Sequence, residues 1–230
     1  MLLPMRWAIA GIFDQLVAPI AKNLEKIAIL GGTRNDVEYL ITAKYNPGIT
    51  STVFGIEDLE PQDFFLDLNN IYERKDSYDL ILCSQVLEHL WDHQNFFDNV
   101  CKLAHTGSYV WLNCPSSNFV HGSPDYYSAG FTASYISNNL RKRNFEIIGE
   151  GNIGSERYYK VLHLTHQWLS EDNHQNLIFG NPIPGKKIRS KIRTLFLRIK
   201  NHAPLLGTSK EITPELKYST ESWVMAKKIV

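Results

Sequence analysis

The residues best suited to chemistry are two histidines and their acidic neighbours. His89 follows Glu88 at the end of the sequence Gln-Val-Leu-Glu-His, and His121 lies four residues before Asp125. Imidazoles ordinarily titrate near pH ~6.5, so either histidine suits a base that takes a proton from a hydroxyl group. Asp125 is a further candidate for this task. Structural roles are also open: His121 as a loop cap, and Glu88-His89 as a helix start that packs at a sheet edge.

Glu88 and His89 could instead hold a divalent metal ion if a second carboxylate stood beside them. The residue in that position is Gln85, whose neutral amide is a poor ligand for a hard cation. The packing role is therefore favoured, and no metal is expected. The three cysteines are odd in number and form no Cys-x-x-Cys pair, which predicts reduced core thiols in a cytoplasmic protein.

These residues need a scaffold, and the hydrophobic pattern predicts one in which strands alternate with helices. A buried strand at 26–30 ends in Gly31-Gly32, and a strand at 78–83 leads into the Gln85 segment. Further strands are expected at 51–57, 64–68, 109–115, 145–148 and 221–230, and helices at 95–104 and 132–143 and from 36 onward. This alternation is typical of an α/β domain with a largely parallel sheet.

Glycine or polar residues recur where the predicted strands end. They are Gly31-Gly32, Glu57, Asp67, Ser84-Gln85 and Asn113. Ligands bind at the carboxyl edge of open parallel sheets. The recurrence therefore predicts one shared pocket.

The chain is expected to form a single domain over residues 1–230. Its parts are an N-terminal helical segment at 1–25, a core at 26–165, a basic helical insertion or lid at 166–220 and a last strand at 221–230. Residues 1–180 carry 13 Lys/Arg against 21 Asp/Glu, a net charge of −8, whereas residues 181–230 carry 11 against 3, a net charge of +8. The asymmetry predicts a basic appendage on an acidic body.

Residues 186–200, KKIRSKIRTLFLRIK, contain seven basic residues and no acid, with aliphatic residues on one helical face. Such a helix could contact an anionic membrane surface or, with less support, RNA. A packing helix or lid between the last two strands, with a solvated basic face, is slightly favoured over both. No uncharged run near the chain's start approaches the roughly 20 residues that a membrane span needs. The expected location is cytoplasmic, with peripheral membrane contact through 186–200 left open and no nucleic-acid partner expected.

The order of these features over residues 26–148 resembles the class I S-adenosylmethionine-dependent methyltransferases, including the ubiquinone-pathway O-methyltransferases. The stretch YDLILCSQVLEHL is similar to the family's fourth strand and the turn after it. CKLAHTGSYVWLNCPSS is similar to the next helix, glycine turn and fifth strand, and the stretch from HGSPDYYSAGF onward resembles a loop found in relatives linked to sugars. The resemblance implies a Rossmann-like three-layer sandwich, with a mostly parallel seven-stranded sheet and an antiparallel last strand.

The resemblance also implies a role for each strand end. Gly31, Gly32 and Thr33 would form the turn beside the methionine part of S-adenosylmethionine, where a residue without a side chain allows close approach. Glu57 would accept hydrogen bonds from the ribose diol. Asp67, with Leu68 beside it, would contact the adenine, and Ser84 and Gln85 would lie under the sulfonium. The glycine pattern departs from the family's, since Thr33 and Asn35 stand where glycines are usual.

The activity implied is methyl transfer to an oxygen of a small molecule or glycan precursor. His121 is the first candidate base and His89 the second. The alternative is an inactive methyltransferase-like scaffold in a membrane-bound glycan-synthesis complex.

Overall fold

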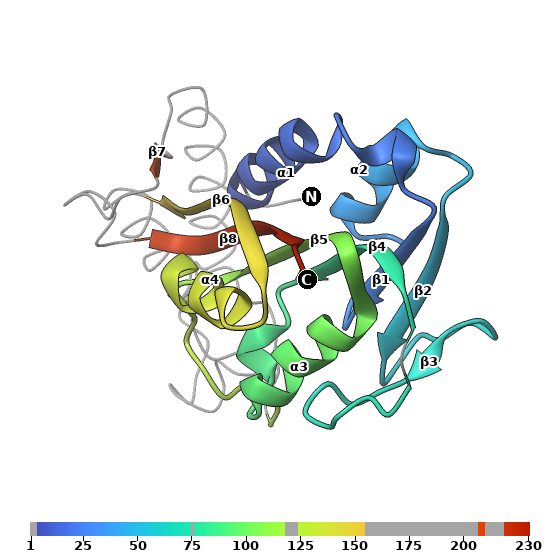
Figure 1. Cartoon of the computed structure of the whole chain (residues 1–230). Coiled ribbons are helices and arrows are strands. Elements are labelled where there is room, and N and C mark those ends of the chain that lie inside the picture. The colour runs from blue at the N-terminus through green and yellow to red at the C-terminus, as the bar shows by residue number, and fades with distance from the viewer. Residues whose placement is uncertain (1–3, 75, 118–123, 155–206, 210–218) are drawn as a thin grey trace, which may run out of the picture.

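The computed structural model describes residues 4–74, 76–117, 124–154, 207–209 and 219–230. In Figure 1, helices lie on both sides of a central sheet. The helices are α1 (Pro4–Val17), α2 (Val37–Tyr45), α3 (His93–Leu103) and α4 (Ala133–Arg141), with 3-10 turns η1 (Ala21–Asn23) and η2 (Leu87–His89). The strands are β1 (Lys26–Leu30), β2 (Thr50–Gly55), β3 (Phe64–Phe65), β4 (Tyr78–Ser84), β5 (Ala104–Pro115), β6 (Phe145–Gly154), β7 (Gly207–Ser209) and β8 (Ser219–Lys228).

The described strands form one sheet in the order β3-β2-β1-β4-β5-β8-β6-β7. The first five pair in parallel, and β8 lies antiparallel between β5 and β6. The predicted Rossmann-like sheet with an antiparallel last strand is therefore confirmed. β7 adds an eighth strand within 166–220, where a helical insertion was predicted. Its Gly-Thr-Ser sequence is too short to show any periodicity, and pairing with β6 makes it a strand.

Two apolar layers, one on each face of the sheet, give the predicted three-layer sandwich (Figure 1). On the face covered by α1 and α2, Phe13 packs on Trp111 with ring centroids 5.0 Å apart, and Trp111 stacks on Trp223 at 5.7 Å. On the face covered by α3 and α4, Phe96 and Phe97 are completely buried. Burying an aromatic or aliphatic side chain contributes roughly 1.5–3 kcal/mol. These contacts hold the helices against the strands whose carboxyl ends carry the polar residues named in the sequence analysis.

Side chains cap the starts of α3 and α4 but not the start of α2. Thr132, the first residue of the predicted helix 132–143, caps α4 by accepting a hydrogen bond from the Tyr135 backbone N–H at 3.3 Å. Asp36 is the N-cap of α2, but its side chain makes no capping bond to the helix. Its carboxylate accepts a bond from the Thr33 N–H at 3.0 Å instead. Asp36 therefore shapes the turn before the helix and not the helix itself.

The direction of the chain around the sheet reverses at β1. The chain runs outward from β1 to β2 and β3, then returns to pair β4 on the other side of β1. At such a switch point the loops after neighbouring strands diverge and leave a crevice for a ligand. The loops that follow β1 and β4 therefore frame the candidate site.

No helix within the described ranges is long and apolar enough to cross a membrane. The basic segment 186–200 lies outside the described residues. Its membrane contact stays a prediction.

Candidate active site

The turn after β1 is built around a glycine that no other residue could replace without strain. Gly31 has a φ of +67°, and a side chain there would bring its Cβ within 2.8 Å of the Val86 methyl groups. The Gly31 N–H donates to the Phe54 carbonyl at 2.8 Å, which extends the β1–β2 ladder into the turn. The residue is exposed, and its contact with a cofactor stays a prediction.

The rest of the turn is closed by side chains. The Asn35 N–H donates to the Thr33 hydroxyl at 3.2 Å, alongside the Thr33–Asp36 bond described above. A methyl group added at Gly32 would overlap the Asp36 carboxylate. Side-chain-to-backbone hydrogen bonds of this kind stabilise turns without requiring glycine. Thr33 thus contributes to the shape of the turn, although the family pattern has a glycine there.

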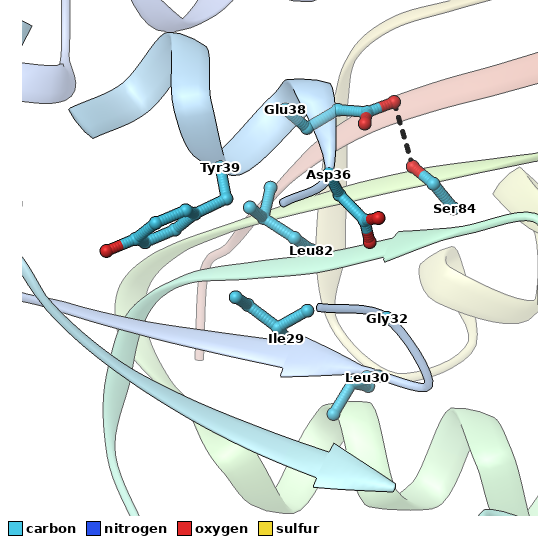
Figure 2. A pocket seen from close by; sticks show the side chains of 8 residues that line it. All are labelled: Ile29, Leu30, Gly32, Asp36, Glu38, Tyr39, Leu82 and Ser84. Atoms are coloured by element: carbon cyan, nitrogen blue, oxygen red, sulfur yellow. Dashed lines mark hydrogen bonds between the residues drawn. The ribbon is translucent and has the colours of Figure 1, made fainter. Parts of the chain in front are cut away.

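Figure 2 shows the cavity on the inner side of this turn. It is lined by Ile29, Leu30, Gly32, Asp36, Glu38, Tyr39, Leu82 and Ser84. The space open to the centre of a water molecule is about 10 Å³, which is room for one water. The cavity is therefore too small for a nucleotide-sized ligand.

Glu57 and Asp67 lie on the connections that follow β2 and β3. The predicted strand 51–57 ends at Gly55, so Glu57 is on a loop; it is exposed and makes no hydrogen bond to another described residue. Asp67 is half-buried, and its Oδ1 accepts from the Asn69 backbone and side chain, both at 2.9 Å. A carboxylate has about four acceptor positions, so Asp67 keeps capacity for an amino group. Leu68 is buried beneath Gly31.

β4 ends at Ser84, and Gln85 follows it in a strained conformation. Gln85 has a φ of +59°, unusual for a side-chain-bearing residue, and its N–H donates to the Asn113 carbonyl at 2.8 Å. Its side-chain amide donates to Asn113 Oδ1 at 3.0 Å and to Glu221 Oε2 at 2.8 Å. Ser84 Oγ donates to Glu38 Oε1 at 3.0 Å (Figure 2). Strain held by surrounding contacts is common where a ligand binds.

Arg6 joins these contacts into one network that the sequence did not predict. Its guanidinium donates to both Glu38 carboxylate oxygens at 3.1 and 3.2 Å and to Asn113 Oδ1 at 2.5 Å. The Asn113 amide in turn donates to Glu221 at 3.1 Å. The network thereby links two helices and three strands at the carboxyl edge of the parallel strands: α1, α2, β4, β5 and β8. The available signal was Arg6 itself, a charge inside an apolar N-terminal stretch.

Glu221 is 4% exposed at the inner end of this network. Burial raises the pKa of its carboxyl to about 7, while the amides of Gln85 and Asn113 and the charge of Arg6 act in the opposite direction. The carboxyl therefore changes protonation near neutral pH.

We expect Glu221→Gln to raise the free energy of unfolding near pH 8 by up to about 3 kcal/mol, and to change it little near pH 5. The folded pKa of about 7 exceeds the ordinary 4.5, so the wild type loses stability as the pH rises through this range. Glutamine keeps the acceptor oxygen but cannot ionise. Urea titrations of both proteins at the two pH values measure the effect, and parallel pH dependence of the two would contradict it.

His89 and Asp125 are brought together by the turn after β4. His89 Nδ1 lies 2.5 Å from the Asp125 carbonyl oxygen, and Nε2 lies 3.9 Å from the buried Glu88 carboxylate. A carbonyl can only accept, so this contact places the hydrogen of a neutral imidazole on Nδ1 and the lone pair on Nε2. The Glu88 carbonyl holds the same loop by accepting from the Tyr127 N–H at 2.9 Å. His121 lies outside the described residues.

In the described part of the chain, no group of three His, Cys, Asp or Glu side chains could hold a metal ion. Cys83, Cys101 and Cys114 are free thiols. Burial raises the pKa of Cys83 and Cys114 well above its usual range, so both remain thiols.

No protein-family model and no curated protein matches the chain. Among solved structures, the chain is similar to the O-methyltransferase of a trans-AT polyketide synthase multienzyme from Brevibacillus brevis, in complex with S-adenosylhomocysteine. Identity is 15%, coverage is 95% of this chain and 71% of that one, and the TM-score is 0.51. It is also similar to coclaurine N-methyltransferase bound to N-methylheliamine and S-adenosylhomocysteine, with 12% identity, coverage of 97% and 70%, and a TM-score of 0.53.

A third similar structure is the [4+2]-cyclase SpnF, with 14% identity, coverage of 94% and 81%, and a TM-score of 0.50. The chain therefore has the fold of class I S-adenosylmethionine-dependent methyltransferases. The cyclase illustrates that the fold alone does not specify the reaction.

Proposed function

We propose, on the premise of this fold, that the chain transfers a methyl group from S-adenosylmethionine to a hydroxyl oxygen of a small molecule or glycan precursor. The observation that carries the proposal is the exposed main chain of Gly31, at positive φ, where β1 ends. The connections after the next two strands of the sheet, β2 and β3, carry the carboxylates of Glu57 and Asp67. This set supplies a close backbone approach, an acceptor pair for a diol and an acceptor for an amino group.

The residues at the edge fit the parts of this cofactor. Glu57 would accept both ribose hydroxyls, because its carboxylate is exposed and is bonded to no other described residue. Asp67 would accept from the adenine amino group. Gly31 would lie against the methionine portion, with Ser84 and Gln85 beneath. When bound, the cofactor supplies an activated methyl group, so the protein has mainly to position the acceptor and manage its proton.

His89 is the base that the described geometry favours. The Asp125 carbonyl fixes the ring through Nδ1, so Nε2 is the atom that would accept the proton of the acceptor's hydroxyl. The Asp125 carboxylate is exposed nearby and is the second candidate. His121 keeps its place as a sequence-based candidate.

The second candidate function is the inactive scaffold. One observation favours it: the side chains of Ser84 and Gln85 are already bonded to Glu38, Asn113 and Glu221. A ligand that used Ser84 or Gln85 would have to exchange those bonds.

Calorimetric titration with S-adenosylmethionine and S-adenosylhomocysteine separates the two functions. The enzyme should bind both with one-to-one stoichiometry, with adenosine weaker and NADH, the ligand of other Rossmann-like proteins, as the control that does not bind. If neither S-adenosylmethionine nor S-adenosylhomocysteine binds, the proposal of methyl transfer is wrong and the inactive scaffold remains. If both bind, sugar nucleotides and phenols with a radiolabelled methyl donor are the first acceptors to test.

A further inference from the structure

Arg34 lies in the turn after β1 and reaches across β2 to its outer side. Its Nη1 and Nη2 donate to the two Asp63 oxygens at 2.8 and 2.6 Å, a paired geometry that is the strongest available between these residue types. Nε donates to Ser51 Oγ at 2.9 Å, and Nη2 also donates to the Ser51 carbonyl at 3.0 Å. One side chain thus links the turn, β2 and the segment before β3.

Asp63 accepts the hydrogen bonds of the Arg34 guanidinium. Its side chain is 0% exposed. Besides Arg34, it accepts from the Val53 N–H at 2.8 Å and from the Glu60 N–H at 2.9 Å. The Arg34 hydrogen bonds lower the pKa of this carboxyl to about 2, with support from the two backbone N–H groups and against the effect of burial. Asp63 is therefore a permanent anion at neutral pH that holds two backbone segments and one cation.

The segment held in this way is the connection 56–63, which carries Glu57. It contains no helix that could dock it on the sheet. Asp58 adopts a φ of +54°, and the Asp63 N–H donates to the Glu60 carbonyl at 2.9 Å. The Asp63 side chain binds the end of this short connection to β2, and Arg34 binds it to the glycine turn.

We propose that Arg34 and Asp63 are positioning residues that fix the distance between the glycine turn and Glu57. This inference rests on the proposed function for its ligand, because Glu57 would bind the ribose of S-adenosylmethionine and Gly31 would contact its methionine portion. Preorganising two loops before binding avoids the ordering cost at the moment of binding. In this chain the ion pair supplies rigidity at the turn position between Thr33 and Asn35, where the family pattern relies on glycines.

Asp63→Asn and Arg34→Lys test the inference. Asparagine keeps an acceptor for Val53 but puts an amide where Arg34 and Glu60 need an acceptor, and lysine keeps the charge but loses the paired geometry. The control is Asp98→Asn, which breaks the Arg143–Asp98 pair of 2.7 Å between α3 and the segment after α4. We expect the dissociation constant for S-adenosylhomocysteine to rise about tenfold in Asp63→Asn, less in Arg34→Lys and not in Asp98→Asn.

Hydrogen exchange supplies a readout that needs no ligand. Amides of 56–62 and 31–36 should exchange faster in Asp63→Asn and keep wild-type rates in Asp98→Asn. If the folded Asp63→Asn protein shows wild-type exchange in both segments, the inference is wrong, whether or not the wild type binds a ligand. If the wild type binds S-adenosylhomocysteine and Asp63→Asn binds it equally well, the inference fails and the proposed function stands. Should Asp63→Asn not fold, Arg34→Lys carries the same two measurements.

Discussion

Replacement of His89 by alanine is expected to lower the turnover of methyl transfer roughly 10²–10⁴-fold, the usual contribution of a base that acts in the transition state. Affinity for S-adenosylmethionine should change little, because the proposed ribose and adenine contacts, Glu57 and Asp67, lie on other connections. The measurement is single-turnover transfer of a labelled methyl group together with calorimetry of the same variant. A loss of cofactor affinity that accounts for the whole effect would contradict the assignment.

The pH dependence of turnover provides a second measurement of the same role. A protonated imidazole cannot accept a proton, so wild-type turnover should fall as the pH is lowered, and His89→Ala should lack this fall. Asp125→Asn tests the second candidate base, because it removes that carboxylate but keeps the main-chain carbonyl that orients His89. If His89 is the base, Asp125→Asn should keep the pH dependence of the wild type. His121→Ala is measured in parallel. If it reduces turnover and abolishes the pH dependence while His89→Ala does not, the base is His121.

Glu57→Ala is expected to weaken binding of S-adenosylmethionine by about 1–3 kcal/mol, the cost of losing a charged hydrogen-bond partner. Glu57 is exposed and has no bond to another described residue, so its removal should leave the free energy of unfolding nearly unchanged. Calorimetry and urea unfolding measure the two quantities. Asp58→Asn is the control, since asparagine tolerates the positive φ at this neighbouring exposed position and removes the same charge.

If Glu57→Ala and Asp58→Asn weaken S-adenosylmethionine binding equally, the effect is one of general charge and the specific role of Glu57 is wrong. Glu57→Gln separates the two explanations further. It keeps one acceptor oxygen for the diol, so binding should fall between the wild type and the alanine variant.

The α/β architecture could be predicted from the sequence because its elements follow local periodicity. Buried parallel strands such as 78–83 are short apolar runs, and the Thr132 cap marks a helix start by its own chemistry. Gly31 was predictable for the same reason, since positive φ is a property of one residue and its turn.

Strand order, and with it the neighbours of each polar strand end, depends on pairing between distant segments. The sequence alone determined that Ser84, Gln85 and Asn113 would stand at strand ends. Only the tertiary structure decided that Arg6, Glu38 and Glu221, from α1, α2 and β8, would meet there. The same holds for Arg34 and Asp63, which are 29 residues apart in the chain. No local pattern encodes such contacts, because hydrogen bonds between side chains depend on where the packed layers bring them.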